Sequence, residues 1–172
     1  MLTLMLLRHA KSSWDDPALD DFDRPLTKRG TKAAREMGAY LAAQDLRPDL
    51  VLCSTAVRTQ ATLALVLPEL GAPAPEVKLI EALYLAPSSD LMDNVKEAGA
   101  GRRRILVIGH NPGLHTFALS LIADGERPAI ADLAMGFPTA ALAVITFERH
   151  RWSELKIATG RLQRLVKPRS RG

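Results

Sequence analysis

Short apolar runs alternate with longer amphipathic segments along the chain. Residues 2–7, with the sequence LTLMLL, are almost entirely apolar, which is typical of a strand covered on both faces. Such a run predicts a buried strand rather than the edge of a sheet. The same pattern predicts further strands at residues 50–53, within 76–84, at 105–108 and, as a final pair that can form a hairpin, at 141–148 and 154–160.

Between these strands, apolar residues recur at the spacing of a helix. Thr27 is suited to cap a helix that runs to about Gln44 with its apolar side chains on one face. A second helix over residues 55–67 is expected to end before Pro68, because proline lacks the N–H that a helix interior needs. Two more helices are predicted at residues 88–99 and 114–124.

This alternation predicts an α/β fold. We expect a three-layer sandwich in which a mostly parallel central sheet is flanked by helices on both faces. A length of 172 residues suits one such domain, and the chain has neither repeats nor an internal linker. We therefore predict a single domain over residues 1–172, with a basic C-terminal tail at about 161–172.

Composition adds an expected location and excludes some partners. Hydrophobic residues make up 47% and charged residues 24%, the balance of an ordinary soluble protein. No apolar run is long enough to cross a bilayer, and the first residues lack the pattern of a signal peptide. Cys53 is the single cysteine and is predicted to be buried and inert, so we expect a cytoplasmic protein.

The charge is mildly basic, with a formal net charge of +4 and a pI near 9.5. Part of the excess lies in the predicted tail, RLQRLVKPRSRG, which contains no acidic residue. The tail also contains no aromatic residue on which a base could stack, so we do not expect nucleic acid as a partner.

Residues suited to phosphate chemistry follow four of the predicted strands. Arg8 and His9 stand at the end of the first strand, and Arg58 comes shortly after the second. Glu81 follows the third strand, and His110 follows the fourth. Because ligands bind beyond the carboxyl ends of parallel strands, we expect these side chains to meet at one edge of the sheet.

Together these residues can transfer a phosphoryl group. Arg8 and Arg58 can clamp the phosphate oxygens with guanidinium forks that stay charged. A neutral His9 can attack phosphorus, and His110 can stabilise the charge that spreads over the oxygens. Glu81 can protonate the leaving group or activate water.

The segments LLRHAKSSWDD, STAVRTQAT and VIGHNPG resemble the signature segments of the histidine phosphatase superfamily, which includes phosphoglycerate mutases. The short length and the stretch DFDRPLTKRG resemble the SixA-type phosphohistidine phosphatases. The likeness runs from residue 1 to about 147. It implies a phosphoglycerate mutase-like fold, with His9 as nucleophile, Arg8 and Arg58 binding phosphate, His110 as the second catalytic histidine and Glu81 as the acid.

Some positions depart from the family pattern. Ala10 stands where the motif usually has glycine, and Asp15 falls where larger members place an asparagine that touches phosphate. A carboxylate would repel phosphate, so that role is not carried over to Asp15, and Lys11 can compensate for the charge. Arg24 and Tyr84 can each either shape the pocket or serve the structure.

Other polar groups have simpler interpretations. The aspartates near residue 21 lack the spacing of a calcium loop, so we expect a solvated loop there. A run of arginines precedes the fourth strand at its amino end, away from the expected site. The residues interpreted as solvated or structural are Asp20, Asp21, Asp23, His115, His150 and the run at residues 102–104.

These observations predict a metal-independent phosphatase without a cofactor that acts through a covalent phosphohistidine. Only 23 residues separate Glu81 from Ile105, which leaves little material to roof the site. An open site suits a phosphohistidine on a protein, with small phosphoesters as alternative substrates. The alternatives left open are a mutase, an inactive module that binds phosphoproteins, and metal-assisted hydrolysis by His9, His110 and an aspartate. The sequence does not indicate the oligomeric state.

Overall fold

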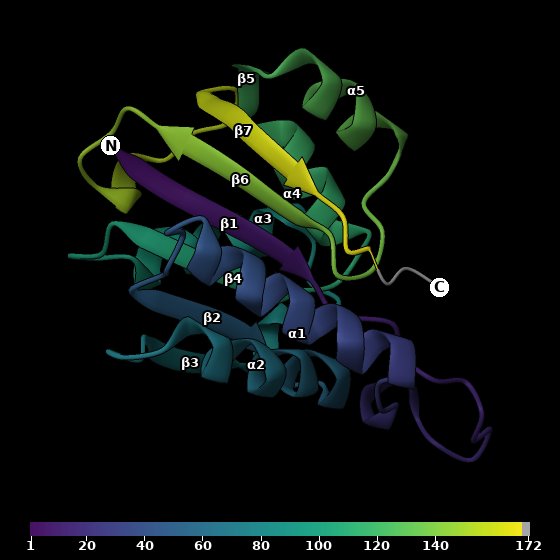
Figure 1. Ribbon diagram of the computed structural model, residues 1–172. Coiled ribbons are helices and arrows are strands. Elements are labelled where there is room, and N and C mark those ends of the chain that lie inside the picture. The colour runs from purple at the N-terminus through teal and green to yellow at the C-terminus, as the bar shows by residue number, and fades with distance from the viewer. Residues whose placement is uncertain (170–172) are drawn as a thin grey trace.

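The computed structural model describes residues 1–169. A seven-stranded sheet lies at its centre, with helices on both faces (Figure 1). The strand order is β3-β2-β4-β1-β6-β7-β5, and of these strands β6 alone runs against the others. This mixed sheet confirms the predicted α/β sandwich. The strands are β1 (Leu2–Arg8), β2 (Leu50–Ser54), β3 (Glu76–Ile80), β4 (Arg104–Gly109), β5 (Ile122–Gly125), β6 (Leu142–Phe147) and β7 (Gly160–Val166).

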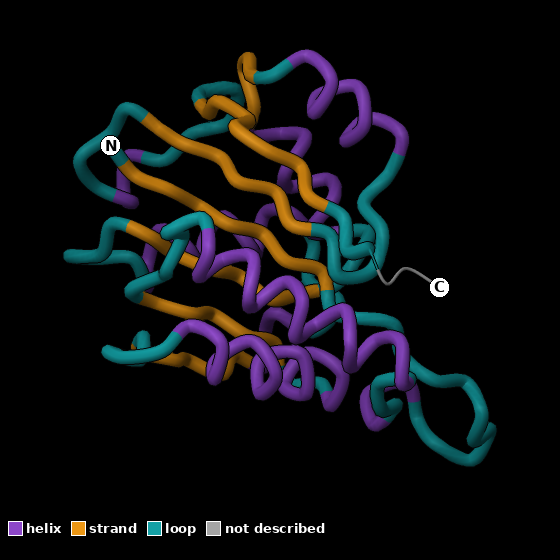
Figure 2. The backbone as a smooth tube through the Cα atoms, viewed as in Figure 1, coloured by secondary structure: helices purple, strands orange, loops and turns teal. Residues whose placement is uncertain are grey.

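The helices form the two outer layers. Figure 1 shows α1 and α2 in front of the sheet, and α3 and α4 behind it. The long loop between β1 and α1 extends past the carboxyl end of β1 (Figure 2). The α-helices are α1 (Lys28–Ala43), α2 (Val57–Leu70), α3 (Ser88–Ala98), α4 (Gly113–Leu121) and α5 (Arg127–Met135), and the 3-10 helices are η1 (Asp21–Asp23), η2 (Glu81–Leu83) and η3 (Trp152–Glu154).

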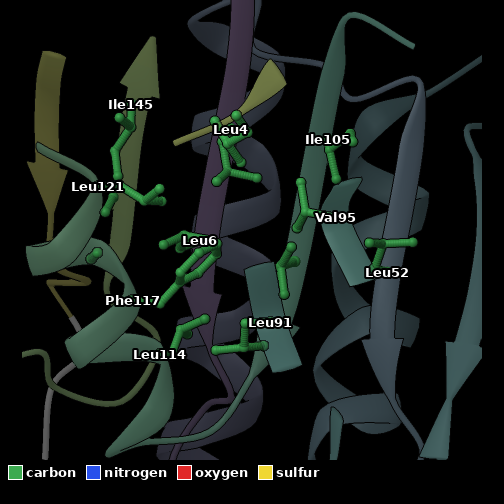
Figure 3. Packing of buried hydrophobic residues seen from close by; sticks show 14 of the residues in the cluster. Leu4, Leu6, Leu52, Leu91, Val95, Ile105, Leu114, Phe117, Leu121 and Ile145 are labelled. Atoms are coloured by element: carbon green, nitrogen blue, oxygen red, sulfur yellow. The ribbon is translucent and has the colours of Figure 1, made fainter. Parts of the chain in front are cut away.

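The apolar run of β1 is explained by burial on both of its faces. Successive side chains of a strand point to opposite sides, so Met5 and Leu7 pack with α1 and α2, whereas Leu4 and Leu6 pack with α3 and α4. All four side chains are fully buried. Figure 3 shows the second of these layers, with the labelled side chains Leu4, Leu6, Leu52, Leu91, Val95, Ile105, Leu114, Phe117, Leu121 and Ile145.

The start of α1 agrees with the prediction. The side chain of Thr27 accepts a hydrogen bond from the N–H of Gly30 at 2.9 Å and so caps the helix. The buried residues of α1 include Ala33, Met37 and Leu41, which lie on the face expected from their spacing. The helix is thereby fixed beside the loop that follows β1.

Some helix boundaries were predicted wrongly. Pro68 does not end the second helix, because it lies in the last turn of α2, where its missing N–H removes a single hydrogen bond. The helix predicted at residues 114–124 ends at Leu121, since residues 122–125 pair with β7 as the strand β5. Helix α5 was not predicted. In residues 122–125, pairing with the distant strand β7 overrides the local helical pattern.

The C-terminal strand also lies later than predicted. The strand predicted at residues 154–160 is not formed there, because these residues contain the end of η3 and a turn. The last strand is β7, which begins at Gly160. Because β7 lies between β6 and β5, residues 161–166 belong to the sheet and not to a tail. This corrects the predicted tail at about 161–172. Residues 170–172 of that tail lie outside the described residues.

Two arginines of this strand have partners that the local sequence does not reveal. Arg161 forms an ion pair with Asp124 at 3.2 Å. The Nη1 of Arg164 donates to the hydroxyl of Tyr40 at 2.9 Å. The acceptors belong to β5 and α1, so the basic segment is matched across the fold although it contains no acid of its own.

Gly113→Ala is expected to lower the free energy of unfolding by about 1–3 kcal/mol. A Cβ at this position would overlap the carbonyl oxygen of Ala86, so the segment before α3 would have to move away from α4. Urea unfolding measures this loss. Gly109→Ala is the matched control, because its Cβ would meet the Cδ1 of Leu114 at an ordinary 3.7 Å. Equal losses in the two variants would contradict the packing argument.

Two further observations concern the described part of the chain. None of the helices within residues 1–169 combines the length and apolar composition that a membrane span requires. Cys53 is fully buried, as predicted, and burial raises the pKa of its thiol to about 12. The thiol is therefore protonated and unreactive at neutral pH.

Candidate active site

His9 directly follows β1 and remains attached to the sheet. Its backbone N–H donates to the carbonyl of Gly109 at 3.1 Å, and the residue is 5% exposed. The Nδ1 of its ring lies 2.7 Å from the carbonyl oxygen of Ala10, whose own N–H is held by the Oγ1 of Thr62 at 3.0 Å. Because a carbonyl oxygen only accepts, Nδ1 carries the proton of the neutral ring and Nε2 keeps a lone pair.

The surroundings of His9 keep its ring neutral. Burial lowers the pKa of His9 to about 4, although the hydrogen bond to Ala10 acts in the opposite direction. At neutral pH the Nε2 lone pair is therefore available in nearly every molecule. The positive groups that also lower this pKa are the guanidiniums of Arg58, Arg8 and Arg24.

His110 follows β4, the parallel neighbour of β1, and its ring centroid lies 5.4 Å from that of His9. Its Nε2 lies 2.7 Å from the Oγ of Ser54 at the end of β2. That Oγ also accepts from the N–H of Ala56 and can donate its own hydrogen to Nε2, an arrangement in which the ring proton of His110 is on Nδ1. Nδ1 is buried and has no partner within residues 1–169. Burial, followed by the charge of Arg58, lowers the pKa of His110 to about 3.

Arg58 lies in the first turn of α2 and is 2% exposed. Its Nε donates to the Nε2 of His9 at 3.3 Å. Its Nη1 donates to the carbonyl of Asp21 at 2.7 Å, and its Nη2 to the carboxylate of the same residue at 3.0 Å. The two bonds to Asp21 orient the guanidinium so that its Nε–H points at the Nε2 lone pair of His9.

Arg8 ends β1 and contacts the segment before β6. Its Nη1 donates to the carbonyl of Phe137 at 3.2 Å, and the Nδ2 of Asn111 donates to the same oxygen at 2.8 Å. The Nε of Arg8 and the Oδ1 of Asn111 are buried, and neither has a partner in the described part of the chain. Arg8 therefore retains an unused donor beside the two histidines.

Asp21 is a residue of this site whose role the sequence did not predict. We expected a solvated loop, but its carboxylate accepts hydrogen bonds from Tyr84 and Arg58 and pairs with the Nε of Arg24 at 3.2 Å. Burial alone would raise the pKa of Asp21, but the hydrogen bonds from Tyr84 and Arg58 bring it down to about 2. This carboxylate is therefore ionised at neutral pH. The ring of Tyr84 also meets that of His110 edge-on, with centroids 5.3 Å apart.

Arg24 and Lys11, whose roles the sequence left open, lie at the outer wall of the site. Arg24 is 7% exposed, and its guanidinium lies over the ring of Trp14, 3.5 Å from the centroid. Lys11 lines the same wall, whereas Asp15 is exposed and does not. The backbone N–H of Asp15 donates to the Oγ of Ser13.

These groups surround a cavity of about 390 Å³ at the carboxyl end of the parallel strands. Four of its lining side chains are positively charged, so the cavity favours an anion. They are Arg8, Lys11, Arg24 and Arg58. The structure thus brings together four of the five predicted site residues. The lining residues are Arg8, His9, Lys11, Ser12, Trp14, Arg24, Arg58, His110, Asn111 and Thr139.

Glu81 is the predicted site residue that does not join the cluster. It begins η2 directly after β3, as its place in the sequence suggested, but it is exposed and does not line the cavity. Tyr84, three residues later, is the side chain of this turn that reaches His110. Within residues 1–169, no three His, Cys, Asp or Glu side chains are arranged to hold a metal ion.

Comparison with known proteins gives one consistent result. The family model described as histidine phosphatase superfamily, branch 1, matches residues 4–84, which contain Arg8, His9 and Arg58. A protein of uncharacterised function from Mycobacterium tuberculosis is 35% identical over 152 residues, covering 87% of this chain and 92% of that protein.

Two solved structures are similar over almost the whole chain. One, from Agrobacterium tumefaciens, is provisionally assigned as the phosphohistidine phosphatase SixA. It is 29% identical, with a TM-score of 0.81, over 97% of this chain and 98% of that one. The other, from Nakamurella multipartitia, has the same provisional assignment. It is 29% identical, with a TM-score of 0.84, over 98% and 96% of the two chains.

Proposed function

The chain belongs to the histidine phosphatase superfamily and is a histidine-type phosphatase of the SixA type, and we propose that its substrate is a phosphohistidine-bearing protein. In this proposal the reaction is metal-independent and passes through a covalent phosphohistidine on His9. Arg8, Arg58 and His110 bind the phosphoryl group. Each role rests on the geometry of the cluster.

His9 is the nucleophile of the proposed reaction. Its Nε2 lone pair attacks phosphorus while the bond from phosphorus to the substrate nitrogen breaks. The other ring nitrogen of the substrate histidine carries a proton, so the imidazole leaves as a neutral ring and keeps the electron pair of the broken bond as a lone pair. Water then attacks the phosphorylated His9 and releases inorganic phosphate, which restores the neutral ring.

The neighbouring donors stabilise the phosphoryl oxygens. The Nε–H of Arg58 donates to the Nε2 of His9 before attack, and it turns to a phosphoryl oxygen once that lone pair bonds to phosphorus. The buried donors without partners, Nε of Arg8 and Nδ1 of His110, supply further hydrogen bonds to the oxygens.

One observation carries this proposal: the rings of His9 and His110 lie 5.4 Å apart, and the pKa of each is far below neutrality. Burial alone lowers the pKa of a histidine, so the position of the two rings beside Arg8 and Arg58 is what points to catalysis. Here one ring supplies a lone pair and the other a proton donor, both at the edge of an anion-favouring cavity.

The choice of substrate rests on the leaving group. Asp21, the carboxylate of the cluster, has a pKa of about 2, and Glu81 does not line the cavity. The described residues of the site therefore offer no protonated carboxylic acid to an alkoxide leaving group. Imidazole leaves phosphorus more readily than an alkoxide, so a phosphohistidine suits this site better than a phosphomonoester.

A substrate panel tests this choice. Turnover of a phosphohistidine protein, a phosphoserine peptide and a sugar phosphate is compared at pH 7 with and without a chelator. We expect the phosphohistidine protein to be turned over fastest and the chelator to leave all rates unchanged. Comparable turnover of the sugar phosphate would contradict the proposed substrate, and activity lost to chelation and restored by zinc would contradict the metal-independent reaction.

The pH dependence of kcat/KM is expected to follow the neutral form of His9. Because burial lowers the pKa of His9 to about 4, the ring stays neutral and reactive down to mildly acidic pH. With the acid-stable substrate p-nitrophenyl phosphate, corrected for its own ionisation, kcat/KM should remain level between about pH 5 and 7 and fall below about pH 4. A midpoint near the ordinary histidine pKa of about 6.5 would show that the ring is not desolvated as described.

A further inference from the structure

A second cavity, of about 510 Å³, lies at the opposite end of the sheet from the histidines. It is bordered by the start of β1, the end of α3, the loop before β4 and the loop after β6. Figure 1 shows the N-terminal end of β1 beside that last loop. We call it the basic cavity, and its lining residues are Met1, Leu2, Lys96, Ala100, Gly101, Arg102, Arg103, Arg149, His150, Arg151, Trp152 and Ser153.

The side chains of the basic cavity carry one sign of charge. Lys96 and four arginines line it, and none of the lining residues is acidic. Within residues 1–169, the only ion pair of these five cations is that of Arg102 with Glu76. Residues 102–104 were predicted to form a solvated face. In the fold, Arg102 and Arg103 instead line this cavity together with cations from α3 and from the loop after β6.

Nearby carboxylates are bonded to backbone groups instead of these side chains. Asp49 accepts from the backbone N–H of Arg103 at 2.9 Å, and Glu154 accepts from the backbone N–H of Arg151 at 3.1 Å. The guanidiniums of both arginines are therefore left without an ion-pair partner in the described residues. Like charges that share a concave surface repel one another, and an anion bound among them removes that repulsion.

The wall of the basic cavity is preformed by packing. Trp152 is 2% exposed, and its Nε1 donates to the carbonyl of Arg102 at 2.7 Å. The loop before β4 lies so close to this indole that a Cβ on Gly99 would overlap the ring. The backbone that carries Arg102 and Arg103 is thus held in place and does not have to be ordered when a ligand binds.

The basic cavity is separate from the proposed catalytic site. Leu2 lines the basic cavity and Arg8 lines the other, so the two lie at opposite ends of β1, about 20 Å apart for a strand of this length. The two cavities share no lining residue. A ligand in one does not contact the other.

From this arrangement we infer that the basic cavity binds a small molecule that carries several phosphate groups. Guanidinium forks match phosphate oxygens in pairs, and five cations suit more negative charge than a single phosphate carries. The volume lies within the range of about 300–1,000 Å³ that is usual for small-molecule sites. This inference goes beyond the proposed phosphatase activity and does not depend on it.

The two tryptophans of the chain allow the two cavities to be observed separately. Trp14 lines the catalytic cavity and Trp152 the basic cavity. In a ¹H–¹⁵N spectrum each indole gives one signal, and Trp14→Phe assigns them. Inorganic triphosphate, added at a constant ionic strength, is expected to shift the Trp152 signal saturably and at lower concentration than orthophosphate does.

Paired variants then identify the residues responsible. Arg103→Ala with Arg149→Ala is expected to weaken the triphosphate affinity reported by Trp152 about tenfold or more, and to leave the Trp14 response unchanged. The control, Lys32→Ala with Arg35→Ala, removes the same charge from the exposed face of α1 and should bind like the native chain. A Trp152 signal that does not shift when triphosphate is added would overturn the inference. Equal losses of triphosphate affinity in the two double variants would also overturn it.

Discussion

His9→Ala is expected to lower kcat toward a phosphohistidine protein by about four orders of magnitude or more. The variant loses the ring nitrogen whose lone pair faces Arg58, in the ring that lies 5.4 Å from that of His110. The remaining donors still hold the phosphoryl group, so KM should change far less than kcat. Steady-state kinetics with a phosphorylated carrier measures both constants.

A control for His9→Ala must remove an imidazole without touching the cluster. His150→Gln does so, because His150 is exposed in the loop after β6, at the opposite end of the sheet from the cluster. Its kcat should stay close to that of the native chain. If His9→Ala retained more than a few per cent of the native kcat while folded, as judged by circular dichroism, the nucleophile would be wrongly assigned.

Arg58→Ala is expected to lower kcat/KM by about 10²–10³-fold. The change removes a buried guanidinium that donates to the nucleophilic nitrogen of His9 and fixes the loop through Asp21. It also removes one of the charges that depress the pKa of His9. The acid limb of the pH profile should therefore move to higher pH, a signature that a loss of folding alone does not produce.

Arg47→Ala is the matched control for this change. Arg47 lies beside the other end of α2, where its Nε donates to the carbonyl of Leu70 at 2.8 Å. Its loss should leave kcat/KM and the pH profile as they are. A kcat/KM for Arg58→Ala within threefold of the native value, or an unshifted acid limb, would contradict the role proposed for Arg58.

The sequence was sufficient to predict the position of the site because parallel strands align their carboxyl ends. Once the apolar runs are taken as strands, Arg8, His9 and His110 must lie at one edge of the sheet. Arg58 follows from the same argument, since the helix that carries it begins next to the end of β2. No long-range information was needed for these four residues.

The contacts of Asp21 and Glu81 depend on information that local patterns lack. The loop after β1 returns across the sheet edge, and only its tertiary path brings Asp21 against Arg58 and Tyr84. Glu81 has the position along the chain that an acid would need, but its side chain is exposed outside the cavity. The position of a residue after a strand therefore predicts proximity to the site, not the direction of its side chain.

The errors in the fold have the same origin. Residues 122–125 continue an apolar helical pattern but become β5, because β7 offers backbone partners for them. Residues 161–166 look like a charged tail, yet Leu162 is fully buried and the arginines beside it find partners on other elements. Strand pairing between distant segments decided both regions.

The most direct test of the account is to trap the phosphorylated enzyme. The protein is mixed with a ³²P-labelled phosphohistidine substrate, quenched within milliseconds in alkali or in acid, and digested for mass spectrometry. We expect label that survives alkali, is lost in acid and maps to His9, and that is absent from His9→Ala. Label that survives acid, maps to another residue or persists in the variant would contradict the covalent phosphohistidine on which the account depends.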